Sequence, residues 1–309
     1  TWATEFGPQG VRVNSVAPGP TSTPGVAAEW GDTNDELGRA GALKESLLAE
    51  GFHEPLANDI LNTIIGGAFA AGGANAINMY VDRDIDALME RTRNRPLVTG
   101  LIKPRNGLIF AIGLEIVAFF WLWYWVNLLT AALGVAACLF YVFVYTLWLK
   151  RTSKSNIVIG GAAGAVPVLI GWTAVTDSLS WAPIVLFAVM FYWTPPHFWA
   201  LAIKYKDDYS AADVPMLPSV VSLHKTALRI LLYTLLLWGL TLVFSPVADM
   251  GLIYLVSAVA LGAAFTWFAV KLLREPNAKA AMKVFTYSIT YITLLFGAMA
   301  VDVLVRNAR

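Results

Sequence analysis

The chain has little charge and almost no cysteine. Charged residues make up 14% of its 309 residues, against about 25% in soluble globular domains. Its 22 basic and 21 acidic residues leave a net charge of +1, which argues against nucleic acid as a partner because a polyanion binder needs a basic surface. The single cysteine, Cys138, excludes an intramolecular disulfide framework and a cluster of thiolate metal ligands.

The chain is rich in hydrophobic residues. Hydrophobic residues form 57% of the chain, above the ~45–50% of soluble proteins. A membrane-spanning helix needs about 20 apolar residues, and eight stretches are long enough, with Glu115 the one charge in mid-stretch. They lie at residues 60–81, 106–126, 128–148, 156–176, 181–203, 230–248, 250–270 and 284–301. Because they are continuous rather than alternating, we expect an all-α bundle of eight transmembrane helices and not a β-barrel.

The basic residues gather in every second loop. Segments 82–105, 149–155, 204–229 and 271–283 hold seventeen of the 22 Lys and Arg residues, and the turns between the other spans hold none. Positive charge favours the cytoplasmic side of a membrane. We therefore expect these four loops to be cytoplasmic.

The first 45 residues do not share this pattern. They are rich in Gly, Pro and Ser, and the run E-F-G-P-Q-G-V-R-V-N-S-V-A-P-G-P-T-S-T-P-G at 5–25 resembles a late segment of short-chain dehydrogenases. The chain has no room before it for that family's catalytic helix or its glycine-rich nucleotide loop. We therefore expect residues 1–50 to be a dehydrogenase-like fragment without function, and residues 51–309 to form a separate transmembrane domain.

The most specific motif, N-A-I-N-M-Y-V-D-R-D-I-D at 75–86, ends the first span. At about 100° per helical residue, Asn78, Asp82 and Asp86 fall within an arc of about 80°, whereas Asp84 points the opposite way. Carboxylates four residues apart have Cβ atoms ~5–6 Å from each other and can share hard cations with phosphate oxygens and water. This spacing predicts a metal site at Asp82 and Asp86. The alternative is a solvated helix end, on which charged residues without a function would be scattered around the helix.

A second polar helix end, H-F-W-A-L-A-I-K-Y-K-D-D-Y, closes the fifth span. If a helix starts at Pro196, then His197, Lys204 and Asp208 lie within about 40° of one another, with Asp207 about 60° to one side. A cation and carboxylates on one face would suit a diphosphate bridged by a metal. Ordinary charge beside the membrane is the alternative.

Basic residues beside these motifs have two interpretations. Lys150 and Arg151 in L-K-R-T-S-K-S-N could bind phosphate oxygens, the arginine with two parallel hydrogen bonds. They could equally serve as topology signals, and the same holds for Arg91, Arg93 and Arg95.

These motifs together resemble the UbiA superfamily of intramembrane prenyltransferases, whose first acidic motif is N-x-x-x-D-x-x-x-D. Asn78, Asp82 and Asp86 match it position by position. Longer strings are similar to the protohaem IX farnesyltransferase branch over about residues 60–305. These strings are R-N-R-P-L, Y-V-F-V-Y-T-L-W-L-K-R, N-I-V-I-G-G-A-A-G-A-V-P, W-T-P-P-H-F-W-A-L-A-I and D-Y-S-A-A-D-V-P-M-L-P.

The resemblance implies a farnesyl group transferred from farnesyl diphosphate to a vinyl group of haem B, giving haem O. It implies Mg²⁺ as cofactor at Asp82 and Asp86, with Asp208 as a third catalytic residue and haem A synthase as a candidate partner. The implied substrate-binding residues are Asn78, Arg91, Arg95, Lys150, Arg151, His197, Lys204, Asp207 and Tyr209. Aromatic faces such as Tyr145, Phe198 or Trp199 would shield an allylic cation. The implied location is the bacterial inner membrane, with the acidic motifs on the cytoplasmic side.

His197 has several interpretations. An ionisable side chain within a membrane span is energetically costly, and its presence there suggests a function. It could contact a haem propionate, bind iron or act as a base. A hydrogen-bonded structural histidine is the further alternative.

The sequence departs from the family in two places. The second family motif, D-x-x-x-D, begins here with Lys204 and ends with Asp208, which leaves fewer acidic ligands. The family has nine spans, whereas G-F-H-E-P-L-A-N-D-I at 51–60 is too short and polar to span. We therefore expect family helix one to be missing and the chain to be a weak enzyme or an inactive chimera. A prenyltransferase with a quinone-precursor acceptor is a further alternative. A transporter is less favoured, since transport sites lie near the bilayer midplane, whereas the acidic motifs of this chain lie at the ends of spans.

Overall fold

The structure, a computed structural model, describes residues 2–7, 10–15, 54–90 and 92–307. The strands β1 (Trp2–Gly7) and β2 (Gly10–Ser15) pair antiparallel, with Trp2 opposite Ser15. The helical elements are α3 (Glu54–Val81), α4 (Arg83–Leu88), α5 (Pro104–Trp125), α6 (Leu128–Leu139), the π-helix η1 (Phe140–Leu149), α7 (Lys150–Thr152), α8 (Asn156–Thr176), α9 (Trp181–Lys204), α10 (Lys206–Ala211), α11 (Leu217–Val220), α12 (Leu223–Val247), α13 (Leu252–Arg274) and α14 (Ala278–Asn307). The all-α class is confirmed for residues 54–307, and the hairpin β1–β2 is the exception. Residues 16–53, most of the dehydrogenase-like fragment, lie outside the described part of the chain.

The eight predicted spans are confirmed. Eight helices of the described chain are long and apolar enough to cross a membrane, and one of them, Leu128–Thr152, combines α6, η1 and α7. Most helices are longer than their predicted apolar stretches, since polar residues continue them toward the membrane surface: α12 begins at Leu223 and not at 230. The helix α8, Asn156–Thr176, has the predicted bounds. The protein is therefore an integral, multi-pass membrane protein.

Caps set the starts of several spans, because the first N–H groups of a helix have no intrahelical partner. α5 begins at Pro104, a residue that has no N–H to satisfy. The side-chain oxygen of Asn127 accepts a hydrogen bond of 2.8 Å from the backbone N–H of Thr130 at the start of α6. The Ser222 hydroxyl accepts from the backbone N–H of Lys225 at the start of α12. These caps hold the turn between α5 and α6 and the entry into α12.

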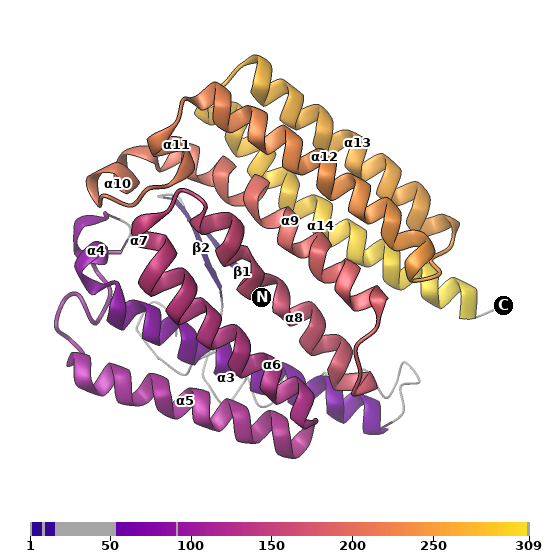
Figure 1. Cartoon of the computed structure of the whole chain (residues 1–309), viewed down its shortest axis with the longest axis horizontal. Coiled ribbons are helices and arrows are strands. Elements are labelled where there is room, and N and C mark those ends of the chain that lie inside the picture. The colour runs from indigo at the N-terminus through magenta and orange to yellow at the C-terminus, as the bar shows by residue number, and fades with distance from the viewer. Residues whose placement is uncertain (1, 8–9, 16–53, 91, 308–309) are drawn as a thin grey trace.

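The spans form two groups that meet between α8 and α9 (Figure 1). In the first group, α3 packs on α5, and α6 packs on α5 and α8. In the second group, α9, α12, α13 and α14 pack on one another. The short helices α4, α7, α10 and α11 lie together at one end of the bundle, so the predicted polar helix ends share that end.

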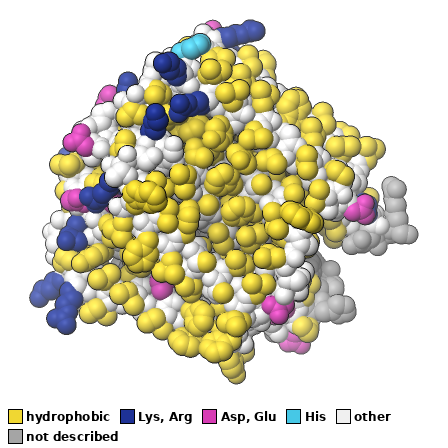
Figure 2. Space-filling model, in the orientation of Figure 1, with side chains coloured by type: hydrophobic (Ala, Val, Ile, Leu, Met, Phe, Trp, Pro, Cys, Tyr) yellow, Lys and Arg dark blue, Asp and Glu magenta, His cyan; other side chains and the backbone are white. Residues whose placement is uncertain are grey.

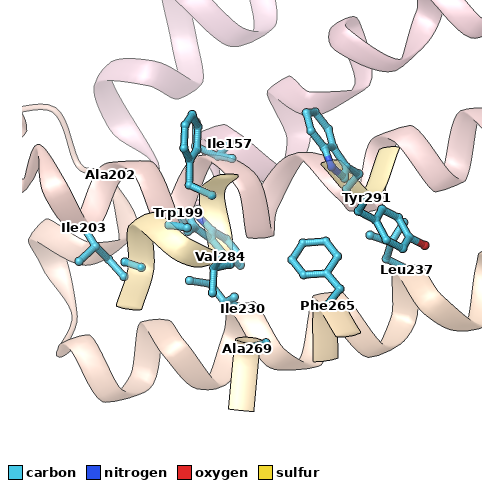
Figure 3. Packing of buried hydrophobic residues seen from close by; sticks show 14 of the residues in the cluster. Ile157, Trp199, Ala202, Ile203, Ile230, Leu237, Phe265, Ala269, Val284 and Tyr291 are labelled. Carbon is cyan, nitrogen blue, oxygen red and sulfur yellow. The ribbon is translucent and has the colours of Figure 1, made fainter. Parts of the chain in front are cut away.

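Large buried side chains fill the second group (Figure 3). The ring of Phe265 packs against that of Tyr291 with centroids 5.2 Å apart, and the indole N–H of Trp193 donates to the backbone oxygen of Ser288 at 2.8 Å. A Cβ atom at Gly262 would overlap the Trp238 ring, so α12 and α13 approach closely only because this residue is glycine. The second group is thus a tightly packed scaffold.

The outer surface is apolar over the spans and basic at one end. Ile109, Phe120 and Trp123 of α5 are large hydrophobic residues exposed on the protein surface, as expected for a helix that faces lipid. Figure 2 shows a broad hydrophobic face, with Lys and Arg side chains gathered along the edge where α4, α10 and the start of α12 lie. The basic loops therefore surround the end that carries the short helices.

α9 differs from the helix that the sequence predicted. It runs without a break from Trp181 to Lys204, with Pro195 and Pro196 inside it, so the expected start at Pro196 is wrong. A proline removes one intrahelical hydrogen bond, and neighbouring groups in a membrane bundle can satisfy the freed carbonyl. His197 consequently lies within a long span and not in the first turn of a polar helix end.

Candidate functional site

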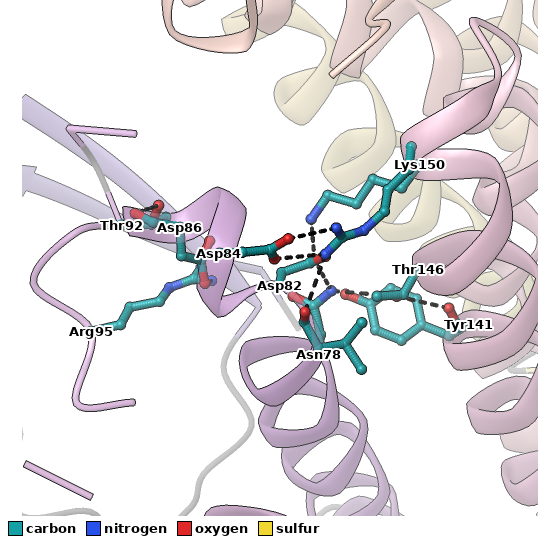
Figure 4. A network of polar contacts seen from close by, with 11 residues as sticks. Asn78, Asp82, Asp84, Asp86, Thr92, Arg95, Tyr141, Thr146 and Lys150 are labelled. Carbon is teal, nitrogen blue, oxygen red and sulfur yellow. Dashed lines mark hydrogen bonds and ion pairs between the residues drawn. The ribbon is translucent and has the colours of Figure 1, made fainter. Parts of the chain in front are cut away.

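Asp82 lies where α3 ends and α4 begins, and its side chain has no exposed surface. The amide of Asn78 donates to Oδ2 of Asp82 at 2.7 Å, and the ammonium group of Lys150 bonds to the same oxygen. Arg151 reaches the other carboxylate oxygen at 3.3 Å. A buried carboxylate is costly unless it is paired and hydrogen-bonded, and these three residues supply that compensation (Figure 4).

The π-helix η1 delivers the residues that face Asp82. Its buried Thr146 hydroxyl donates to the backbone oxygen of Tyr141 at 2.9 Å and lies 3.3 Å from the amide nitrogen of Asn78. Lys150 follows directly, and its backbone N–H bonds to the oxygen of Tyr145, five residues earlier. Such π segments are often found at functional sites. Nothing in the residue types of this apolar span signalled it.

Asp86 has a separate basic partner. Nη1 of Arg95 donates to Oδ2 of Asp86 at 2.6 Å, and the Asp86 side chain is 4% exposed. The Thr92 hydroxyl donates to the backbone oxygen of Asp86 at 3.0 Å, which folds the following loop back onto α4. Arg95 therefore lies at the acidic motif, whereas Arg91 lies outside the described residues.

Asp84 does not stand apart from the other acids, and that expectation was wrong. Its carboxylate makes a two-bonded ion pair with Arg151, at 2.7 and 2.8 Å, and Arg151 also contacts Asp82. The physical reason is the bend at Asp82 between α3 and α4, because an angular count at α-helical spacing does not carry across a break. The hydrogen bonds from Arg151 lower the pKa of Asp84 to about 2.

The donor set fits Mg²⁺ bound together with a phosphate ligand. Among the described residues, no three His, Cys, Asp or Glu side chains gather as a metal cluster. Asp82 and Asp86 offer two carboxylates, and Mg²⁺ is commonly held by one or two carboxylates with substrate phosphates and water. Three acids here face three bases, Lys150, Arg151 and Arg95, so the ligand-free cluster is balanced in charge.

The second predicted polar segment is less organised. Lys204 and Asp207 are exposed, and Asp208 and Tyr209 are half-buried. The Lys204 ammonium lies over the Tyr205 ring at 5.3 Å from its centroid. Within the described chain Lys204 and Asp208 form no ion pair with each other, because α9 ends at Lys204 and α10 begins at Lys206.

His197 lies deep in the second group of spans and not beside Lys204. Its Nδ1 atom is 2.7 Å from the Ser288 hydroxyl, and its ring stacks on Trp193 with centroids 4.4 Å apart. Phe285 packs on the ring from α14. This environment favours the structural interpretation of His197 among those that the sequence left open.

A cavity of about 260 Å³ lies between the first acidic motif and the loop that follows α10. Asp84 and Arg151 line it from α4 and α7, and Ala212, Asp213 and Val214 line it from the loop after α10. Asp213 has a backbone φ of 50°, a left-handed conformation that Asp adopts more readily than most residues. Asp213 is not among the predicted site residues, although it stands in the string D-Y-S-A-A-D-V-P-M-L-P.

Solved membrane-protein structures share this helix arrangement. A digeranylgeranylglyceryl phosphate synthase superposes with a TM-score of 0.67 at 19% identity, over 81% of this chain and 86% of that chain. A UbiA homologue from Archaeoglobus fulgidus, bound to GPP and Mg²⁺, superposes with a TM-score of 0.54 at 14% identity, over 79% and 88%. The fold is therefore that of the UbiA-type membrane proteins.

The family follows from the sequence comparison. The model described as the UbiA prenyltransferase family matches residues 42–296, and the chain belongs to this family. A protohaem IX farnesyltransferase of Parafrankia sp. (strain EAN1pec) is 54% identical over 244 residues, 77% of each chain. Another, from Gloeobacter violaceus, is 49% identical over 257 residues, 83% of this chain and 84% of that protein.

The pairing of Asp86 yields a stability prediction. Arg95→Ala should lower the free energy of unfolding by on the order of 1–3 kcal/mol, because it leaves a buried carboxylate without its partner. The exposed Arg93, two residues earlier in the same loop, offers the control, and Arg93→Ala should have little effect. Thermal unfolding in detergent measures both, and equal effects would refute a specific role of the Arg95–Asp86 pair.

Proposed function

We propose that this protein transfers the farnesyl group of farnesyl diphosphate to a vinyl group of haem B. The C–O bond to diphosphate breaks, a C–C bond to the vinyl carbon forms, water adds at the neighbouring carbon, and haem O and diphosphate are the products. The identity of 54% to a protohaem IX farnesyltransferase carries this proposal. We further propose haem A synthase as the partner that consumes haem O.

The acidic cluster gives each residue a proposed role. Asp82 and Asp86 would hold Mg²⁺, which when bound neutralises the leaving diphosphate as a Lewis acid. Asn78 orients the Asp82 carboxylate through its 2.7 Å hydrogen bond. Lys150 and Arg95 place cationic donors where negative charge develops on the leaving group, and such preorganised charge stabilises a transition state. Arg151 would bind the diphosphate as a substrate-binding residue.

The aromatic residues of η1 suit the apolar part of the reaction. Tyr141 and Tyr145 stack with centroids 5.4 Å apart and an interplanar angle of 23°, directly before Thr146 of the acidic cluster. Aromatic faces stabilise a nearby cation, and a dry environment protects it from water. Trp199 is buried against the Tyr233 ring, so we assign this role to Tyr145 and not to Trp199.

The segment after α9 supplies the other side of the proposed site. Asp208 as a catalytic residue, and Lys204, Asp207 and Tyr209 as substrate-binding residues, remain proposals. Their place in the chain supports them, because the loop that directly follows α10 lines a cavity together with Arg151 and Asp84.

Acceptor choice provides the direct test of function. Purified full-length protein with labelled farnesyl diphosphate and Mg²⁺ should give labelled haem O with haem B, and no labelled product with 4-hydroxybenzoate. Product with 4-hydroxybenzoate alone would support a quinone-precursor acceptor instead. Absence of product with both acceptors would support an inactive chimera.

Asp82 is expected to be indispensable for turnover. Asp82→Asn should reduce Mg²⁺-dependent turnover by at least about a hundredfold, because the variant loses a buried charge at the centre of the cluster. Asp84→Asn should retain most of the maximal rate at saturating farnesyl diphosphate. Steady-state rates of the two variants decide, and equal losses would contradict the proposed metal site at Asp82 and Asp86.

We also propose that the chain lies in the bacterial inner membrane with the acidic cluster on the cytoplasmic side. The support is the basic edge around that end of the bundle and the preference of positive charge for the cytoplasm. Residues 51–309 would form the catalytic unit, since the family match covers 42–296 and every proposed site residue lies beyond 51.

The single cysteine makes this topology testable. Cys138 is buried, so Ser210→Cys and Ser178→Cys each add one exposed thiol, in α10 and in the turn after α8. In intact cells a membrane-impermeant maleimide should label Ser178→Cys and should label Ser210→Cys only after lysis. The reverse pattern would overturn the orientation.

A further inference from the structure

Arg151 joins the outer and inner acids of the site. Its Nη1 and Nη2 atoms bond to the two carboxylate oxygens of Asp84 at 2.7 and 2.8 Å. Nη2 also donates to the backbone oxygen of Val81 at 3.1 Å and to Oδ1 of Asp82 at 3.3 Å. Figure 4 shows Asp84 at the start of α4, beside Asp82 and near Lys150, the neighbour of Arg151 in the chain. Asp84 therefore makes the shortest contacts of Arg151, and the only two-bonded contact among them.

The two acids differ in exposure. The Asp84 side chain is 62% exposed, and that of Asp82 is fully buried. Lys150 and Asn78 already bond to Oδ2 of Asp82. Asp82 therefore does not depend on Arg151 alone for compensation, which leaves Arg151 able to serve a ligand.

Arg151 needs an orienting partner. It belongs to the three-residue helix α7, and its long side chain is 34% exposed. Holding such a side chain in one geometry costs conformational entropy. Asp84 fixes the planar guanidinium by two parallel bonds and so reduces the cost of ordering Arg151 when a ligand arrives.

Arg151 has room beside it. The cavity of about 260 Å³ is lined by Arg151 and Asp84 on one side and by the loop that contains Asp213 on the other. A ligand that enters from this side meets the guanidinium before it meets Asp82. Without Asp84, the arginine would be left with its two longer contacts to Val81 and Asp82 and could turn into the cavity.

We propose that Asp84 is a positioning residue: it holds the Arg151 guanidinium at the acidic cluster, ready to bind the diphosphate of the prenyl substrate. This proposal rests on the proposed function. Asp84 acts through Arg151, and it touches neither the metal nor the reacting atoms. Its contribution therefore belongs to diphosphate affinity and not to the maximal rate.

The test measures binding separately from turnover. Isothermal titration with farnesyl thiolodiphosphate and Mg²⁺, without haem, gives the dissociation constant of the full chain and its variants. Asp84→Ala should raise this constant about fivefold, near the upper limit for an exposed ion pair, and Asp84→Asn, which keeps one acceptor oxygen, should lie between. Arg151→Ala should raise it about tenfold or more, and Asp84→Ala added to Arg151→Ala should have no further effect. In the turnover assay Asp84→Ala should raise KM for farnesyl diphosphate and leave kcat unchanged.

Asp249 provides a matched control. It is an exposed aspartate paired with Arg306 at 3.0 Å, between the spans α12 and α13, and Asp249→Asn should leave binding unchanged. Unchanged affinity in Asp84→Ala, or a full fivefold loss on top of Arg151→Ala, would overturn the positioning role. Tighter binding by Asp84→Ala would overturn it as well, because Asp84 would then compete with the ligand for Arg151. A wild-type chain that binds no thiolodiphosphate would overturn the proposed function itself.

Discussion

Asp82 is a carboxylate without exposed surface at the end of a transmembrane helix, and the need to compensate its charge organises the surrounding structure. Bringing Lys150 and Arg151 to this carboxylate draws the third span, Leu128–Thr152, against the end of α3. Asn78, one turn before Asp82, completes the arrangement from the same helix. The charge cluster is therefore part of the packing of the bundle, as well as the proposed place of chemistry.

Stability and chemistry are placed in different parts of the molecule. The bulky aromatic core lies among α9, α12, α13 and α14, where Trp193, Phe265 and Tyr291 are fully buried or nearly so. The acidic cluster is built instead by α3, α4, η1, α7 and the loop that carries Arg95, at a break between two helices. This division allows the cluster to change its ion pairs when a ligand binds, while the aromatic core stays fixed.

The eight spans were predictable because membrane insertion depends on the length and polarity of single segments, which a sequence states directly. The partnership of Asn78 and Asp82 was predictable for the same local reason, since residues four apart share a helix face. The contacts of Asp84 and His197 could not be predicted from the sequence. Arg151 is 67 residues from Asp84 and Ser288 is 91 residues from His197, and only the packed bundle brings them together. The break at Asp82 and the unbroken course of α9 through two prolines likewise depend on neighbouring helices.

The π-helix before Lys150 gives the third span a fixed angular phase. Each i→i+5 turn takes up about one residue more than an α turn, so the ten residues of η1 determine the direction in which Lys150 and Arg151 leave the helix. The hydropathy of the span does not depend on this angle. A one-residue insertion or deletion in η1 would leave a span of nearly the same length and hydrophobicity. It would nevertheless rotate Lys150 and Arg151 around the helix axis and away from Asp82. The length of η1 is therefore constrained by the direction in which Lys150 and Arg151 must point, and not by the thickness of the membrane.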